Sequence, residues 1–487
     1  MNQKFCFWKV TTYARWVIAT AGLIWVVGAR AEDGGSLDSF LARVAENNAQ
    51  VQAARLQKEA ASLKKRQGDL QELAPLLLLE GGYSNDSQET AFPTQQGTRT
   101  LGKFYSLGVS KKLITGTTLS AQWSQTHSDI EGLAFPYQPV WDSRFMLGIS
   151  QSLWKDGFGR GVRLRHERED AQEKLNLLTA EMQERQVLVD AESVFWDFAV
   201  QVLDRQEKAD ALKRAEKIRA WTLRRLGSGI GDRADRLQVE SLIASRKLAQ
   251  ISSGDSYESS RRRVADALGV PEAELGELGL ELLSRERELP VLDSAAEPRR
   301  LDVWIQSYAA RIGESVARET REMLRPDLSL QGAFGANARE AEIGDSSADA
   351  LARDTSVYRV GLKLALNLDF GLKSDLRRAA DAEAKAARLK SDKLARDRAS
   401  SWSELARRHA ELGSSIRAME SLVKAQEAQL EREQERLSLG RTTTFQVITF
   451  EQAVADARLS LLQLRAGQRK LEAASRLYLT QNAVEAL

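Results

Sequence analysis

Few residues of this chain combine a reactive type with a spacing that could do chemistry. The run Gly227-Ser228-Gly229-Ile230-Gly231 has the composition of a phosphate-binding loop, but it follows a predicted helix rather than a strand. His127, His166 and His409 lie far apart and lack the spacing of metal ligands. Neither a Ser/His/Asp set nor a pair of catalytic carboxylates can be argued. The sequence therefore predicts a protein that is not an enzyme and that has no cofactor and no metal site.

The N-terminal segment 1–31 has the pattern of a secretory leader. An apolar run over 16–28 is followed by Ala29-Arg30-Ala31, which matches an A-x-A cleavage site, and it is preceded by the basic residues Lys4, Lys9 and Arg15. The run is too short to span a bilayer comfortably, which favours a cleaved leader over an uncleaved membrane anchor. Cleavage would also remove Cys6, the only cysteine of the chain. We therefore expect an exported protein without disulfides.

Charge and composition exclude several classes of protein. Hydrophobic residues make up 43% and charged residues 28% of the chain, which is too apolar for disorder and too charged for a bundle of membrane helices. The formal net charge is +2, and loss of the four basic residues of the leader would make it −2. Arg261-Arg262-Arg263 is most simply a solvated helix face. We therefore expect no nucleic-acid partner.

The first half of the chain, 32–270, is predicted to contain a helix, several strands and a long helical hairpin. The period of its apolar residues indicates a helix over 37–73, which Pro75 ends. Strands are predicted over 76–83, 101–113, 118–126 and 144–153. Two helices then follow, over 158–226 and 232–268, with the glycine-rich run between them. Phe195, Trp196 and Phe198 of the long helix are expected to be core residues.

The same order of elements returns after a proline-containing linker over 271–300. The second half, 301–487, is predicted to contain a helix over 301–324, strands over 328–334 and 358–368 joined by a polar loop, and helices over 373–437 and 444–478. This order indicates two tandem structural repeats.

Residue matches around two helix-breaking turns support the duplication. Gly229 and Gly440 can be aligned, and Arg225-Leu226 and Arg436-Leu437 precede them. Further along, the matched pairs are Leu237 and Ile448, Glu240 and Glu451, Ala244 and Ala455, Leu248 and Leu459, and Ile251 and Leu462. The steps between these pairs are three or four residues, so each set lies on one helix face.

One strand of the second repeat has the alternation of a transmembrane β-strand. Val360, Leu362, Leu364, Leu366 and Leu368 form an aliphatic face, and polar or small residues such as Arg359 and Lys363 lie between them. An ordinary half-buried antiparallel strand is the alternative. When strands lie in a bilayer, all their backbone groups are paired only if the strands form a closed barrel. A handful of strands cannot close a barrel. A membrane location therefore requires several copies of the chain.

In this order and duplication, the chain resembles the TolC-like outer-membrane efflux protein family over its whole mature length. The segments that carry the resemblance are Ala53-Ala54-Arg55-Leu56, Leu73-Ala74-Pro75, Ser150-Gln151-Ser152-Leu153, Arg325-Pro326-Asp327-Leu328-Ser329-Leu330 and the two Leu-x-x-Gly turns. The chain departs from the family at Asn47-Asn48, where the family often has Asn-Pro. A further hairpin around 111–126, with Thr115-Gly116-Thr117 as its turn, either widens the barrel or extends it outside the membrane.

The resemblance implies a mainly α-helical homotrimer in the outer membrane of a Gram-negative bacterium. Each copy would add strands to one shared β-barrel in the outer-membrane lipid, and antiparallel coiled-coil helices would form a tunnel through the periplasm. A periplasmic adaptor (membrane fusion) protein would dock at the tip turns, and an inner-membrane pump would drive solutes or proteins through the duct. Such a duct serves a tripartite efflux pump or a type I secretion system. The tip residues would be Arg225, Leu226, Gly229, Arg436, Leu437 and Gly440. The alternative function is a structural trimeric coiled-coil envelope protein without a through-pore.

The resemblance also implies a constriction at the tunnel entrance. The acidic residues expected just after the second turn are replaced here by Gln446 and Thr449, and Asp235 and Gln238 hold the matching places in the first repeat. A single acid per copy argues against strong cation selectivity. Helix capping is an alternative role, because Thr443-x-x-Gln446 has the pattern of a capping box and Asp232 that of an N-cap.

Overall fold

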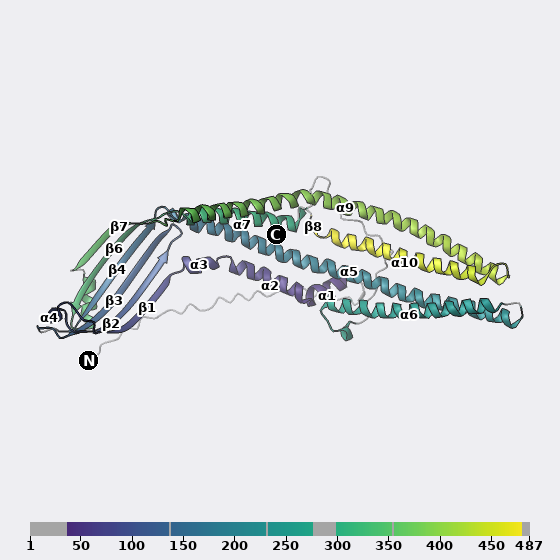
Figure 1. Cartoon of the computed structure of the whole chain (residues 1–487), viewed down its shortest axis with the longest axis horizontal. Helices are drawn as coiled ribbons and strands as arrows, with labels where there is room; N and C mark the ends of the chain where they lie inside the picture. Colours follow the sequence, from purple (N-terminus) through teal and green to yellow (C-terminus); the bar gives the residue numbers. More distant parts are fainter. Residues whose placement is uncertain (1–36, 136–137, 230–231, 276–298, 353–354, 480–487) are drawn as a thin grey trace, which may run out of the picture.

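The computed structural model describes residues 37–135, 138–229, 232–275, 299–352 and 355–479. The predicted leader and most of the 271–300 linker lie outside these ranges. The molecule is elongated, with a β-sheet at one end and long helices that run from it to two turns at the other end (Figure 1). No helix within the described ranges has both the length and the apolarity to cross a membrane.

Strands from both halves of the chain form one antiparallel sheet in the order β1-β2-β3-β4-β6-β7. Their bounds are Leu76–Asp86, Arg99–Lys112, Thr117–Glu131, Val140–Ser152, Asp327–Glu340 and Ser356–Ala365. All the predicted strands are present, and most are longer than expected. The hairpin β2–β3 lies within the sheet, between β1 and β4, so it adds two full strands rather than an external extension.

The last predicted strand is shorter than the alternation of leucines indicated. Strand β7 ends at Ala365, so Leu366 and Leu368 lie outside it. Side chains here compete with the backbone hydrogen bonds of the sheet. The Asn367 side chain accepts a hydrogen bond from the amide of Asp369 at 2.9 Å, and the Asp369 side chain caps helix α9 (Phe370–Ser438) by accepting from the amide of Leu372.

The single helix predicted over 37–73 is wrong, because three helices occupy this segment: α1 (Leu37–Asn47), α2 (Ala49–Lys64) and α3 (Gln67–Glu72). Asn48 breaks the first two apart. Its backbone is extended, and its side chain accepts hydrogen bonds from the amides of Gln50 and Val51 as the N-cap of α2. Its side-chain amide also donates to the carbonyl of Ala267 at 2.9 Å, which fixes the break against helix α6 (Arg233–Leu268).

Four long helices form a curved wall. They are α5 (Arg160–Gly227), α6 (Arg233–Leu268), α9 (Phe370–Ser438) and α10 (Thr444–Ser475). Helix α6 packs on α5, α5 on α10 and α10 on α9, so α6 and α9 are the two margins of the wall (Figure 1). With 68 residues, α5 reaches roughly 100 Å. Nearer the sheet, α7 (Leu301–Met323) packs between α5 and α9, and α2 packs on α5.

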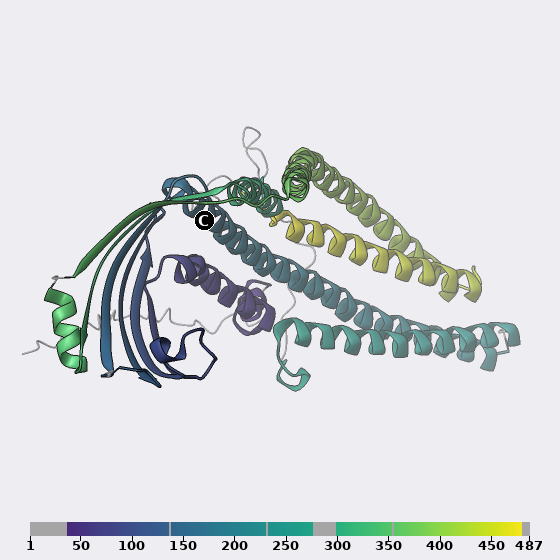
Figure 2. The same ribbon diagram turned by 60° about the vertical axis from the view of Figure 1, so that its left-hand side comes forward.

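Several short elements were not predicted. Helix α8 (Ile343–Ala352) occupies part of the expected polar loop between β6 and β7, and it lies beside the sheet (Figure 2). Helix α4 (Pro93–Gln96) lies between β1 and β2. Two-residue strands β5 (Arg299–Arg300) and β8 (Tyr478–Leu479) pair with each other. Single 3-10 turns cover Gly157–Gly159 and Glu272–Glu274.

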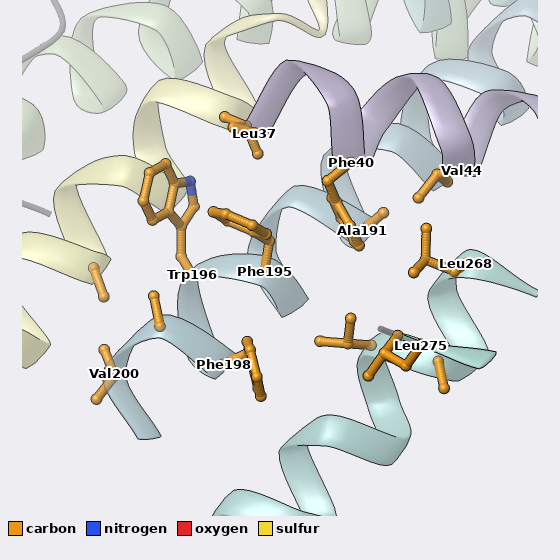
Figure 3. Packing of buried hydrophobic residues seen from close by; sticks show 14 residues of the cluster. Leu37, Phe40, Val44, Ala191, Phe195, Trp196, Phe198, Val200, Leu268 and Leu275 are labelled. Carbon is orange, nitrogen blue, oxygen red and sulfur yellow. The ribbon is translucent and has the colours of Figure 1, made fainter. Parts of the chain in front are cut away.

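The main core cluster lies where α1, α5 and α6 meet. Phe195 and Trp196 of α5 are almost fully buried there, and the Phe195 ring contacts that of Phe40 at a centroid distance of 5.2 Å (Figure 3). Leu37 and Leu268 complete the cluster from α1 and α6. The prediction of core roles for Phe195, Trp196 and Phe198 is confirmed.

Candidate functional site

The pairing register sorts the side chains of the sheet onto two faces. A row across five strands runs through Val109, Ala121, Leu147, Phe334 and Tyr358, each paired with the next. Directly paired residues lie on the same face of a sheet. The same side carries Leu77 and Leu79 of β1 and Val360, Leu362 and Leu364 of β7. We call this side the apolar face.

The opposite side carries small and polar residues. The neighbouring row runs through Ser110, Ser120, Gly148, Ala333 and Arg359. Lys363 lies on this side four residues further along β7 than Arg359. We call it the polar face. The alternation predicted for β7 therefore extends across the sheet and divides it into two chemically distinct surfaces.

Most of the apolar face has no cover within the described residues. Val360 is 78% exposed and Leu147, in the middle of the sheet, is 44% exposed. Helix α8 covers only one end of this face, where Ser346 bonds Ser143 at 2.7 Å and Ser347 accepts from Gln125. An exposed apolar surface that extends across several strands indicates contact with another molecule or with lipid.

The two outer strands of the sheet each have one unpaired edge. In the part of the chain that the structure describes, β1 pairs with β2 alone and β7 with β6 alone. Free edges expose backbone donors and acceptors, which pair readily with another strand. Within one copy of the chain, the sheet is thus open.

The two predicted tip turns share one geometry. Gly229 and Gly440 have φ angles of +75° and +70°, which L residues rarely adopt. Each glycine amide donates to the carbonyl of the leucine three residues earlier, Leu226 or Leu437, at 3.1 and 3.0 Å. Both turns lie at the same end of the molecule, far from the sheet (Figure 1).

The arginines and leucines before the turns have different surroundings. Arg225 stacks over the ring of Trp221 at 4.8 Å, whereas Arg436 pairs with Glu433 at 2.8 Å. Leu437 is buried in a cluster shared by all four long helices, and Leu226 is only half-buried.

The four constriction candidates lie within the first two turns of α6 and α10. Asp235 is half-buried, while Gln238, Gln446 and Thr449 are exposed. The Thr449 hydroxyl donates to the carbonyl of Phe445, so a backbone group already satisfies it. Their role at an entrance stays a prediction.

Asp232 and Thr443 cap their helices as predicted, but Gln446 does not take part in a capping box. Asp232 accepts from the amide of Ala234, and Thr443 accepts from the amide of Gln446 at 3.3 Å. The Gln446 side chain bonds the hydroxyl of Thr442 instead of completing the capping box.

Ion pairs that the sequence did not reveal join the two helical hairpins. Arg214 of α5 donates to Glu451 of α10 at 2.7 Å and to Glu207 at 2.7 Å, and Arg458 of α10 pairs with Glu207 at 2.9 Å. The Glu451 side chain is fully buried. Burial lowers the pKa of the Arg214 guanidinium, but its bonds to the two carboxylates outweigh burial and raise the pKa. The only sequence signal was the position of Glu451 on the repeated face.

A second charged cluster lies where α3 and α5 meet near the sheet. Ligand atoms of Asp69, His166 and Glu169 lie within 4.8 Å of one another, although the spacing of the histidines had indicated no metal site. Arg165 bonds Asp69 at 3.1 Å and contacts Glu169 at 3.5 Å, so a guanidinium already provides the positive charge. Burial raises the pKa of the Asp69 carboxyl, but the hydrogen bonds and charges of His166 and Arg165 lower it by more, so the pKa lies below its ordinary value. This cluster is best described as an ion-pair network.

No protein-family model and no curated protein sequence matches the chain. Solved structures do match. The outer membrane protein VceC of Vibrio cholerae is 13% identical, with a TM-score of 0.67 over 90% of this chain and 94% of that one. The CmeC outer membrane channel of Campylobacter jejuni is 12% identical, with a TM-score of 0.66 over 91% and 85%. The open MtrE outer membrane channel of Neisseria gonorrhoeae is 16% identical, with a TM-score of 0.65 over 91% and 88%.

These matches extend over nine tenths of the chain, so they include both the sheet and the helical wall. At such low identity, they establish the fold. The chain therefore has the fold of outer-membrane channels, the fold that its resemblance to the TolC-like family implies.

Proposed function

We propose that this chain is the outer-membrane exit duct of a tripartite efflux pump or a type I secretion system. Three copies would assemble around one axis in the outer membrane of a Gram-negative bacterium. The sheet would cross the membrane, the helical wall would extend through the periplasm, and solutes or proteins would pass through passively.

The observation that carries this proposal is the two-faced open sheet. Its exposed apolar face, with residues such as Val360 and Leu147, suits lipid, and its polar face with Arg359 and Lys363 suits a water-filled lumen. The edges of β1 and β7 need partners in a membrane. Three copies of six strands would give an eighteen-stranded barrel, a size that leaves an aqueous channel. The hairpin β2–β3 contributes a third of these strands.

The opposite end of the molecule suits contact with a periplasmic adaptor protein. The two glycine turns at Gly229 and Gly440 end two hairpins of equal construction. A trimer would therefore present six such hairpin ends around its axis. An inner-membrane pump would supply the driving force, because we assign no catalytic group to this chain.

Conductance across a planar bilayer tests the duct. Thiol reagents should reduce the current through a channel of Ser120→Cys, since Ser120 lies on the polar face. The adjacent Leu119→Cys variant, whose cysteine lies on the apolar face, is the matched control and should be insensitive. The only natural cysteine, Cys6, lies in the predicted leader.

The alternative, a structural envelope protein, makes the opposite prediction. A purified oligomer that conducts no ions, even when Gly229 or Gly440 is substituted to loosen the tip, would contradict the duct and favour a spacer. Equal block of both cysteine variants would show that the two faces do not separate lumen from lipid.

A further inference from the structure

The apolar face of the sheet is not flat, because a groove of about 640 Å³ crosses it from β2 to β7. The row of apolar residues that contains Leu147 lines one side of the groove. The neighbouring row on the same face lines the other side. In that second row, each residue pairs with the next, and its members are Lys111, Leu119, Ile149, Gly332 and Val360.

Small residues deepen the groove between larger apolar side chains. Gly332 has no side chain, and a Cβ at this position would lie 3.0 Å from a methyl carbon of Ile149. Ala121 contributes only a methyl group on β3. Around them, the side chains of Leu147 and Ile149 stand out from the sheet and are 44% and 51% exposed. The groove is therefore an apolar channel that is open along its length.

One charged side chain lies at the β2 end of this groove. Lys111 and Arg359 are its two charged lining residues, and the register places only Lys111 on the apolar face. Lys111 is exposed, and its ammonium group has no ion pair or hydrogen bond to any residue that the structure describes. The next residue, Lys112, faces the other way and pairs with Asp156 at 2.6 Å. Lys111 thus leaves a positive charge without a counterion beside an apolar surface.

Lys111 lies at the end of the sheet that joins the helices. It precedes the last residue of β2, and at this end β4 leads towards α5 and β7 towards α9 (Figure 1). One step further towards the helices, the apolar face becomes polar, since Thr117 and Gln151 pair there and their side chains bond each other at 2.5 Å. If the apolar face contacts lipid, this polar pair marks the periplasmic boundary of the membrane, and Lys111 lies beside it.

From this boundary, the groove rises into the membrane. Its other end lies at Val360, in the middle of β7. Barrel strands tilt by about 40°, so the segment from Val360 to Ala365 rises roughly 13 Å, close to half of a hydrocarbon core of about 30 Å. Across the strands, the spacings between β2 and β7 add up to roughly 19 Å. These dimensions suit one extended acyl chain in a single leaflet.

We propose that the groove holds an acyl chain of an anionic phospholipid from the periplasmic leaflet, with the lipid phosphate bound at Lys111. This inference rests on the proposed function, because it requires the apolar face to contact lipid. The phosphate supplies the counterion that Lys111 lacks, and the chain covers the apolar sides of the groove. A lysine at a membrane boundary can also extend into water without binding a lipid. That arrangement predicts no preference among phospholipids, whereas the proposed site predicts one.

Lipid retention tests the site in the full chain, purified from outer membranes of a Gram-negative host. The oligomer is reconstituted into vesicles of equal parts phosphatidylglycerol and phosphatidylethanolamine, then released in mild detergent for native mass spectrometry. The unmodified protein should retain phosphatidylglycerol in excess. Lys111→Gln should reduce this excess about fivefold, because it removes one cation from the membrane boundary. The control Lys103→Gln removes an exposed lysine from the same face at the opposite end of β2, and it should retain the excess.

Filling the groove gives a second measurement that does not change charge. Ala121→Leu places a larger side chain in the groove and should lower the retention of both lipids. The matched control Gln122→Leu adds the same side chain on the polar face and should have no effect. Heat-modifiable mobility shows whether each variant has folded. If Ala121→Leu does not fold, the comparison of Lys111→Gln with Lys103→Gln decides alone.

Two results would overturn the lipid site: an undiminished excess of phosphatidylglycerol in Lys111→Gln, or an equal loss in Lys103→Gln. Conductance of the same unmodified sample separates this inference from the duct. A conducting oligomer that shows no preference for phosphatidylglycerol contradicts the lipid site alone. A preference in an oligomer that conducts no ions contradicts the duct alone.

Discussion

The sheet and the helical wall place their apolar residues in opposite ways. In the wall, clusters of apolar residues around Phe195 and Val447 are buried between helices. In the sheet, an apolar surface with Leu147 and Val360 faces outward over most of its area. The wall is built like a protein in water, and the sheet like a protein in lipid. The proposed function would place these two ends in two different solvents.

The wall also holds its helices together with buried charge, which the sheet does not do on its apolar face. Glu451 of α10 is fully buried beside Arg214 of α5, with 2.7 Å between the carboxylate and the guanidinium. Such pairs are weak sources of stability when compared with apolar residues, but breaking one leaves an uncompensated buried charge. The comparison therefore predicts that removing one charged side chain of a buried pair lowers the stability of the wall. Adding a charged side chain to the apolar face should lower the stability of the sheet.

The largest expected effect is the loss of Arg214. Arg214→Met leaves the buried Glu451 carboxylate without its cation and should lower the free energy of unfolding by about 3–5 kcal/mol. The double variant Arg214→Met/Glu451→Met should recover most of this loss. Urea unfolding followed by helical circular dichroism measures both. Arg236→Met, which removes a solvent-exposed pair with Glu240, is the control and should have a much smaller effect, because water screens exposed ion pairs.

A charge on the apolar face of the sheet should have the next largest effect. Val109→Arg places a guanidinium where we expect lipid and should cost about 2–4 kcal/mol if the site lies near the bilayer midplane. Ser110→Arg, one residue along on the polar face, should cost little. The fraction of folded, heat-modifiable protein in outer-membrane extracts measures the difference. Equal tolerance of both variants would contradict the assignment of the two faces.

The turns at the end of the wall should respond to a smaller extent. Gly440→Ala forces an L residue to a φ of +70° and should cost about 1–2 kcal/mol. A Cβ at this position meets no neighbour, so the cost is conformational rather than steric. Gly227→Ala at the end of α5 is the control and should be neutral or stabilising, since that residue is helical. Thermal unfolding of each variant gives the values.

The smallest effect concerns pH. Burial raises the pKa of the Glu181 carboxyl, but Lys58 and Arg185 lower it more strongly, so it lies below its ordinary value of 4.5. A lowered folded-state pKa contributes stability above the unfolded value, and this contribution is lost as the pH falls through the folded pKa. We expect a loss of less than about 1 kcal/mol below pH 4.5, because the pair is partly exposed. Glu181→Gln should flatten this dependence, whereas Glu59→Gln on an exposed part of α2 should preserve it. An unchanged acid limb in Glu181→Gln would assign the effect to other carboxylates.

The order of elements could be predicted from the sequence because it depends on local patterns. The long helices follow from apolar periodicity and from the near absence of proline, and their ends follow from Gly229, Gly269 and Gly440, whose positive φ angles end a helix. The core roles of Phe195 and Trp196 follow from the same periodicity. Boundaries were less predictable at Asn48 and Asn367, where a side chain competes with the backbone for hydrogen bonds.

The sequence by itself determined the helix-ending turns at Gly229 and Gly440 and the alternation of Val360, Leu362 and Leu364. Each of these follows from residues close together in the chain. Only the tertiary structure decided that the hairpin β2–β3 lies within the sheet and that Glu451 meets Arg214. It also decided that Leu237, Leu248 and Ile251 of α6 stay exposed, whereas Glu451 and Ala455 on the matching face of α10 are buried. Periodicity fixes which face of a helix is apolar, but the partner of that face is chosen by packing between distant segments, so similar faces in the two repeats have different surroundings.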